Sequence, residues 1–397
     1  MHPLIVFSEK GPFERGLQYG RVAKLAIYNN VNNFIRMISS IEEIPILRLI
    51  EDLKKNYKYL LDEDFIEEIK GISFATGLKF HYLLVYNIFR EVFVPDECTV
   101  LIAMKTATKN GNNIFLKNSD KIGSEKFVGN KYFKYKEINV ILIEKPENKN
   151  KIIGVSAAGS IGLKMGINEK GVVAGTNISR TLELKQKKAD IVQLRALDRA
   201  KLIRDALIET NDATAAASFV IKRLMDTPME TPGNIEFVDS EKATLIEGSY
   251  DKIAVEIVTD GVIVRANHFV ILKELNDPEN ISSFARYIRA NRLLNDNKGS
   301  ITVEKMIEFS QDHENGPGPN SICRHSNDFR EETSLSAAVM EIKKQDPMDS
   351  KIYIALGKPC HAWRNPKGHI MLTMKTKEEE IPEGFRNGDI WKEFYIE

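Results

Sequence analysis

Cys98 is the residue whose type and position best suit covalent chemistry. It precedes an apolar, β-branched run, Thr99 to Ala103, that predicts a strand. A thiol can attack a carbonyl carbon and form a thioester when a nearby base takes its proton. The alternative is a buried cysteine that packs as a small hydrophobic side chain.

Four polar residues are predicted near strand ends or loop ends, where they could serve such a nucleophile. They are Asp120, Asn177, Asn267 and Arg324. A thiol, a carboxylate, two amides and a guanidinium together could carry out acyl transfer. Taken singly, each is more often a strand-end cap or a surface group, because Asn and Asp side chains readily bond to nearby backbone.

Two histidines offer a competing arrangement. His268 follows Asn267, and His325 follows Arg324. Either imidazole could activate a cysteine in a papain-like pair. Such a pair would work in the uncleaved chain, so the two hypotheses differ in which form of the protein is active.

The sequence predicts no metal and no cofactor. Cys98, Cys323 and Cys360 look too few and too scattered for a disulfide framework or a metal cluster. The segment Asp312-His313-Glu314 lacks the HExxH spacing of a zinc protease. The glycine-containing turns lack the strand and helix context of a phosphate-binding loop.

The composition is that of a globular protein. The 397 residues are 43% hydrophobic and 28% charged, with 56 basic and 56 acidic residues. This balance argues against a disordered chain and offers no basic field for nucleic acid. The apolar start, residues 1–7, is too short for a signal peptide, and no apolar run approaches the roughly 20 residues of a membrane helix. We therefore expect a cytoplasmic protein with no membrane partner.

The elements around Cys98 change in character along the chain. Helical periodicity covers 11–39, 45–61, 65–76 and 80–93, and no strand is predicted before Cys98. After Cys98, strands in hairpins alternate with helix pairs at 188–224 and 281–312. The predicted strands are 98–103, 113–118, 138–143, 152–155, 163–167, 172–177, 235–238, 243–247, 253–258, 262–266, 335–342, 352–356 and 369–374. This order predicts one α+β domain, with antiparallel sheets stacked on each other and helices outside.

Short motifs in the same order resemble those of a known family. They are Gly11-Pro12-Phe13-Glu14-Arg15-Gly16-Leu17-Gln18-Tyr19-Gly20, Asn87-Ile88-Phe89-Arg90-Glu91, Cys98-Thr99, Asn118-Ser119-Asp120, the glycine-rich double strand 159–177, Asn267-His268 and Ser321-Ile322-Cys323-Arg324. The chain resembles the isopenicillin-N acyltransferase (penicillin acyltransferase) family of cysteine N-terminal-nucleophile (Ntn) hydrolases. Its wider relatives include bile-salt hydrolases and acid ceramidase.

The resemblance implies a four-layer αββα sandwich and autocatalytic cleavage between Glu97 and Cys98. Residues 1–97 would form a helical α chain and residues 98–397 a catalytic β chain, associated as one structural domain. The chain departs from the family's pattern at two positions. Glu97 stands where the acyltransferase has Gly, and Ser119 replaces an aromatic residue.

The resemblance also implies roles for single residues. Cys98 would be the nucleophile, Asp120 and Arg324 would position it and its amine, and Asn267 would bind the oxyanion; Asn177 is carried over as a further site residue. The substrate would be a small acyl amide or acyl thioester, with water or an amine as acceptor. The alternative from another class is an uncleaved, inactive binding protein on the same fold. The sequence leaves a homo-oligomer open.

Overall fold

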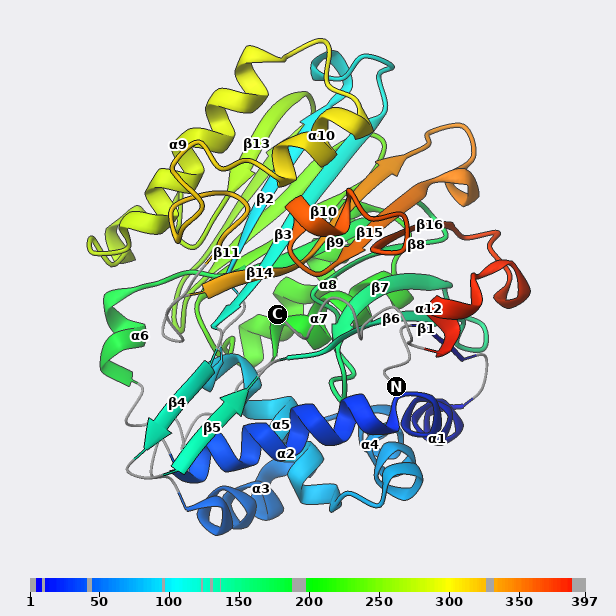
Figure 1. Cartoon of the computed structure of the whole chain (residues 1–397), viewed down its shortest axis with the longest axis vertical. Coiled ribbons are helices and arrows are strands. Elements are labelled where there is room, and N and C mark those ends of the chain that lie inside the picture. Colours follow the sequence, from blue (N-terminus) through cyan, green and yellow to red (C-terminus); the bar gives the residue numbers. More distant parts are fainter. Residues whose placement is uncertain are drawn as a thin grey trace.

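Two stacked β-sheets form the centre of the protein. The computed structural model describes residues 5–8, 11–40, 45–94, 97–122, 124–128, 131–135, 137–187, 198–325 and 332–387. Helices cover the outer faces of both sheets (Figure 1). The expected α+β sandwich with four layers is therefore confirmed.

The larger sheet has eight strands and is antiparallel except at one edge. In spatial order they are β1 (Ile5–Ser8), β6 (Asn139–Glu144), β7 (Ile152–Ala157), β8 (Met165–Asn168), β9 (Val173–Ile178), β10 (Gly233–Val238), β11 (Ala243–Gly248) and β12 (Ile253–Val258). Strand β1 pairs in parallel with β6. The prediction that no strand precedes Cys98 is therefore wrong, because an apolar run of four residues finds its partner far along the chain.

The smaller sheet carries Cys98. Its six strands are β13 (Gly261–Arg265), β2 (Glu97–Met104), β3 (Asn113–Ile122), β14 (Glu332–Ile342), β15 (Lys351–Leu356) and β16 (His369–Thr373). The predicted hairpin of β2 and β3 is confirmed, and Gly111 supplies the positive φ of +77° in its turn. A register shift between Ser334 and Ser336 marks a bulge in β14 opposite β3.

Two groups of helices enclose the sheets. The first group covers the larger sheet and consists of α1 (Pro12–Val22), α2 (Lys24–Ser40), α3 (Ile46–Leu60), α4 (Glu63–Thr76), α5 (Phe80–Phe93), α7 (Arg199–Glu209) and α8 (Ala213–Asp226). The second group covers the smaller sheet and consists of α9 (Ile281–Asp296), α10 (Val303–Ser310) and α11 (Pro359–Ala362). In Figure 1 helices α1 to α5 gather at the bottom and α9 and α10 at the top.

Several predicted boundaries need correction. The helix expected over 11–39 is two helices, α1 and α2, that meet at Ala23. The helical interval expected over 188–224 lies partly outside the described residues. Its remainder forms the expected pair of helices, α7 and α8, separated at Asn211-Asp212. Other elements without a counterpart among the predicted helices and strands are the hairpin β4 (Ser124–Val128) and β5 (Lys131–Tyr135), and the helices α6 (Leu182–Lys187), α11 and α12 (Glu383–Asn387).

Glycines explain how α1 and α4 come into close contact. A Cβ on Gly16 would lie 1.9 Å from the Glu68 carbonyl oxygen, and a Cβ on Gly71 would lie 2.1 Å from that of Phe13. Both distances are far inside van der Waals contact, so any side chain there would push the helices apart. Gly16 belongs to the opening motif noted in the sequence, and its role there is this close helix crossing.

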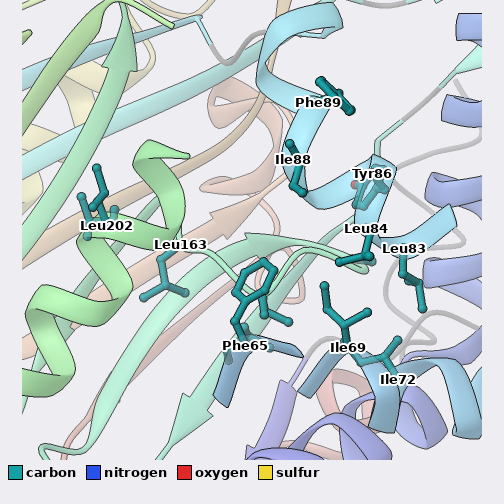
Figure 2. Packing of buried hydrophobic residues seen from close by; sticks show 14 of the residues in the cluster. Phe65, Ile69, Ile72, Leu83, Leu84, Tyr86, Ile88, Phe89, Leu163 and Leu202 are labelled. Atoms are coloured by element: carbon teal, nitrogen blue, oxygen red, sulfur yellow. The ribbon is translucent and has the colours of Figure 1, made fainter. Parts of the chain in front are cut away.

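Segments 1–97 and 98–397 share one hydrophobic core. Apolar side chains of α1 to α5 pack against β6, α7 and α8 in a single buried cluster. Figure 2 shows within it Phe65 and Ile69 of α4, Leu84 of α5, Leu202 of α7, and Leu163, which lies between β7 and β8. A second cluster fills the space between the sheets, and a third lies between the smaller sheet and α9 and α10. The proposed division at residue 97 therefore runs through one structural unit.

Buried ion pairs add to this shared core. Glu68 of α4 lies 3.0 Å from Arg204 of α7, and Arg90 of α5 lies 3.0 Å from Glu137. All four side chains are almost completely buried. Removing one partner of such a pair typically costs about 3–5 kcal/mol. These pairs thus hold the first segment to the second independently of the peptide bond that joins them.

Among the described helices, none is long and apolar enough to cross a membrane.

Candidate active site

Cys98 lies at the start of β2, and its side chain is completely buried. Side chains alternate between the two faces of a strand. Val100 and Ile102 of the same strand belong to the core between the sheets, so the thiol of Cys98 points to that side. Ser119 is its cross-strand neighbour on β3 and shares this face. The structure therefore places the candidate nucleophile between the two sheets.

The backbone of Cys98 is held by two side chains. Its N–H donates to Asn267 Oδ1 at 3.3 Å, and its carbonyl oxygen accepts from Arg286 Nη1 at 2.9 Å. Arg286 Nη2 also donates to Asn267 Oδ1 at 2.6 Å. These contacts hold the backbone groups on both sides of the Cys98 Cα, the N–H and the C=O.

The orientation of the Asn267 amide follows from its partners. Backbone N–H groups and guanidinium groups can only donate, so the atom facing Cys98 and Arg286 must be the oxygen. The nitrogen, Nδ2, donates to the carbonyl oxygen of Ile178 at 2.9 Å. In this conformation Asn267 therefore accepts from the Cys98 nitrogen, and the oxyanion role expected for it stays a prediction.

Glu97 is buried in a group of arginines. Its carboxylate lies 2.5 Å from Arg180, 2.6 Å from Arg324 and 3.9 Å from Arg286. Burial alone would raise the pKa of Glu97, but the three guanidinium groups outweigh it and hold this pKa well below its ordinary value. Glu97 is therefore an ionised side chain that fixes the residue on the acyl side of the expected cleavage site.

Asp120 stands directly opposite Glu97 on β3 and is completely buried. Its Oδ1 accepts from Ser334 Oγ at 2.6 Å, and Ser334 Oγ in turn accepts from the Arg324 backbone N–H at 2.9 Å. The Arg324 guanidinium lies 3.8 Å from Asp120 Oδ2. Burial raises the pKa of Asp120, and Arg324 and Arg286 oppose the rise. Asp120 and Arg324 thus belong to one connected group next to Glu97.

Asn177 lies at the end of β9 and supports the segment that carries Asn267. Its side-chain nitrogen donates to the carbonyl oxygen of Ala266. Asn234 of the neighbouring strand β10 donates to the same oxygen at 3.3 Å. The structure therefore places Asn177 one residue away from the Asn267 contact, where it can hold that segment in place.

The two histidines of the papain-like alternative contact other groups. His268 Nδ1 lies 2.6 Å from Ser283 Oγ. His325 Nε2 lies 3.3 Å from Cys360 Sγ and 3.7 Å from Cys323 Sγ. Burial, together with Arg286 and Arg265, lowers the pKa of His268 to about 4, so this imidazole is neutral at pH 7.

Three further candidates for functional residues were not predicted from the sequence: Arg180, Arg286 and Ser334. Arg286 carried a signal that could have been used. The buried positions of α9 are Ser283, Arg286, Ala290 and Leu294, which follow the helical period. An arginine on the apolar face of a helix needs a buried partner. That partner set here is the Cys98 carbonyl, Thr99 and Asn267.

Comparisons with known proteins identify the family of this chain. The chain belongs to the acyl-coenzyme A:6-aminopenicillanic acid acyl-transferase family, whose model matches residues 106–360. This range contains Asp120, Asn177, Asn267 and Arg324, and it begins after Cys98. The chain is also 20% identical over 364 residues to an uncharacterized protein of Archaeoglobus fulgidus. That match covers 77% of this chain and 57% of the relative, so the chain spans little more than half of the relative's length.

Three solved structures are similar at low identity. An N-acylethanolamine-hydrolyzing acid amidase ortholog of Caenorhabditis elegans is 14% identical, with a TM-score of 0.42 over 61% of this chain and 92% of that one. Penicillin V acylase from Agrobacterium tumefaciens is 12% identical, with a TM-score of 0.38 over 65% and 83%. A mutant of the conjugated bile acid hydrolase from Clostridium perfringens is 12% identical, with a TM-score of 0.40 over 71% and 93%.

Proposed function

We propose that this protein is a self-processing cysteine Ntn enzyme that cleaves or transfers the acyl group of a small N-acyl amide. The observation that carries the proposal is the hydrogen bond from the Cys98 backbone N–H to Asn267 Oδ1. After cleavage before Cys98, the same nitrogen would be an α-amine held by the same oxygen. Family membership supports acyl transfer as the general chemistry.

Maturation would begin with attack of Cys98 Sγ on the carbonyl carbon of Glu97. The C–N bond breaks as the thioester forms, and the thiol proton passes to the leaving nitrogen of Cys98. Water then hydrolyses the thioester, which leaves a carboxylate on Glu97 and a free α-amine and thiol on Cys98. Arg180 and Arg324 support this step because they hold the Glu97 side chain on one side of the bond.

Turnover would use the new α-amine as the general base. Its reference pKa is about 7.7–8.0, close to the roughly 8.5 of a thiol, so a proton can move between the two groups near neutral pH. Asn267 and Arg286 would orient the residue through its nitrogen and carbonyl oxygen. Attack on a substrate carbonyl releases an amine and leaves an acyl-Cys98 thioester, which water or a second amine then resolves.

Intact mass spectrometry tests this proposal directly. Cleavage between Glu97 and Cys98 gives fragments of roughly 11 and 34 kDa, in proportion to the 45.1 kDa of the chain. We expect both fragments to co-purify, with Cys98 as the new N-terminus, and Cys98→Ala to stay whole. Cutting of Cys98→Ala at the parent's rate would instead assign the cleavage to an outside protease.

The same mass spectrum, together with an assay of activity toward acyl amides and thioesters, separates the alternatives. An intact wild-type chain that hydrolyses acyl amides would overturn the N-terminal mechanism in favour of a Cys–His pair. An intact chain with no activity toward acyl amides or thioesters would favour a binding protein on this fold. Only co-purified fragments together with activity agree with the proposal.

A further inference from the structure

Two histidines and two cysteines converge beside the smaller sheet. His313 follows α10, Cys323 and His325 lie in the next loop, and Cys360 lies on α11. One donor atom from each residue lies within 4.8 Å of the other three. Cys323 and Cys360 are buried, and neither is in a disulfide. The fold thus brings together cysteines that were expected from the sequence to be too scattered for a metal cluster, and that expectation is wrong.

The three separations that involve His325 Nε2 agree with edges of one coordination tetrahedron. With Zn–N near 2.05 Å and Zn–S near 2.3 Å, a regular tetrahedron has edges of about 3.3 Å between two nitrogens and about 3.6 Å between sulfur and nitrogen. His313 Nε2 and His325 Nε2 are 3.1 Å apart. His325 Nε2 lies 3.3 Å from Cys360 Sγ and 3.7 Å from Cys323 Sγ. Each separation is close to the edge expected for its pair of atoms.

Hydrogen bonding alone explains this arrangement poorly. The Nε2 atom of His325 carries either one hydrogen or one lone pair, so it can make one good hydrogen bond. Three partners nevertheless surround it: a second imidazole nitrogen and two sulfur atoms. Donor atoms that all approach one point in this way are what a shared metal ion requires.

We propose that His313, Cys323, His325 and Cys360 bind one zinc ion. Sulfur and imidazole nitrogen favour zinc over magnesium or calcium, which prefer oxygen ligands. Four protein ligands complete a tetrahedron and leave no open position for water or substrate, which is typical of a structural zinc site. This assignment reverses the expectation of a protein without metal.

The proposed zinc site lies next to Arg324, a residue of the candidate active site. Arg324 lies between the ligands Cys323 and His325, and its guanidinium contacts Glu97 at 2.6 Å. The ion would fasten the loop that carries Arg324 to α11 and to the end of α10. The importance of fixing Arg324 for the active site rests on the proposed function, whereas the binding of zinc does not.

Metal analysis of the full-length protein tests the proposal. The protein is produced in medium with added zinc and freed of loosely bound metal by gel filtration. Its zinc content is then measured by inductively coupled plasma mass spectrometry. We expect about one zinc per chain. Cys360→Ser and Cys323→Ser should lower this content severalfold or more, whereas Cys98→Ala, a control for thiols, and His361→Ala, a control for histidines, should retain it.

Cobalt gives a second readout that does not depend on the variants folding. Zinc is removed from wild-type protein by a chelator under reducing conditions, and Co²⁺ is added. Two thiolates and two imidazoles should produce the visible absorption of tetrahedral cobalt, with charge-transfer bands from sulfur, and zinc should displace it. Wild-type protein that holds neither zinc nor cobalt would overturn the proposal. A Cys323–Cys360 disulfide in freshly purified protein would overturn it as well.

Discussion

The side-chain oxygen of Asn267 accepts the backbone N–H of Cys98 at 3.3 Å, although the residues lie 169 positions apart in the chain. The same oxygen accepts from Arg286 at 2.6 Å, which fixes which way the amide faces. The nitrogen that would become the catalytic amine therefore has a defined partner before any cleavage occurs.

Replacing Asn267 should slow turnover through loss of this partner. We expect Asn267→Ala to lower kcat of the processed enzyme by about 10²-fold, the typical cost of misplacing a reacting group. Asn267→Asp should recover part of the loss, because it keeps an oxygen facing Cys98. Steady-state kinetics with an acyl amide measures both.

The control for that experiment is Asn291→Ala, which removes an amide on α9 whose one hydrogen bond among the described residues is to Tyr287 of the same helix. Its kcat should be unchanged. Equal losses in Asn267→Asp and Asn267→Ala would contradict the acceptor role and favour the side-chain nitrogen as oxyanion donor.

Glu97 should stabilise the uncleaved chain. In a Cys98→Ala background, which isolates that form, Glu97→Gln removes the carboxylate that pairs with Arg180 and Arg324. Breaking a buried ion pair costs about 3–5 kcal/mol, and denaturant unfolding measures this loss. Glu279→Gln is the control, because its pair with Lys185 is exposed and such pairs are worth about 0–1 kcal/mol.

This contribution also has a defined pH dependence. Because the pKa of Glu97 is lowered in the folded chain, its stabilisation is present above the ordinary carboxyl pKa of about 4.3 and is lost as the pH falls below it. The difference between Cys98→Ala and the double variant should therefore shrink in acid. A difference that stays constant from pH 7 to pH 3 would show that the ion pairs are not its origin.

His268 should be dispensable as a base. Its imidazole is neutral at pH 7 and contacts Ser283, so His268→Gln, which can keep that contact, should retain most of the turnover. Kinetics of the processed variant provides the measurement. A loss of 10²–10⁴, the range for removing a general base, would favour the papain-like hypothesis instead.

Glu236 should destabilise the protein at neutral pH. Neither of its buried carboxyl oxygens accepts a hydrogen bond from the described residues. Burial raises its pKa to about 7, despite Lys117, Arg265 and Arg199. The folded chain therefore holds this proton more tightly than the unfolded chain does, and stability attributable to Glu236 falls as the pH rises from about 4.3 to 7.

Glu236→Gln removes that cost. We expect its free energy of unfolding to exceed that of the parent by up to about 3 kcal/mol at pH 8 and by little at pH 5. Glu209→Gln, at an exposed pair with Lys149, should show no such pH dependence. An equal effect of Glu236→Gln at both pH values would disprove the titration.

The sequence was sufficient where a local signal determined the structure. The strands expected over 98–103 and 113–118 form the β2–β3 hairpin, and the helix expected over 65–76 is α4, which Asp62 caps and Gly77 ends. Strand β1 was missed because its pairing depends on β6, far away in the chain. Short apolar segments gain a structure only when such a partner exists.

The candidate site was predictable to a similar degree. Asp120, Asn267 and Arg324 could be selected because they stand at strand or loop ends near motifs. Arg180 could not, since its importance comes from the carboxylate that the fold brings to it. Arg286 was detectable as an arginine on the apolar face of a helix, but its partner, the Cys98 carbonyl, was not. The grouping of Cys323 with Cys360 likewise exists only after α11 packs against β14 and β15.

The core shared by residues 1–97 and 98–397 has a consequence for how a processed molecule would unfold. Once the Glu97–Cys98 bond is cut, the protein is a heterodimer, and separation of its two chains on unfolding makes refolding bimolecular. The melting temperature of processed protein should then rise with protein concentration, whereas that of the uncleaved Cys98→Ala form should not. Cleavage of a single peptide bond would thereby make refolding after heating depend on protein concentration.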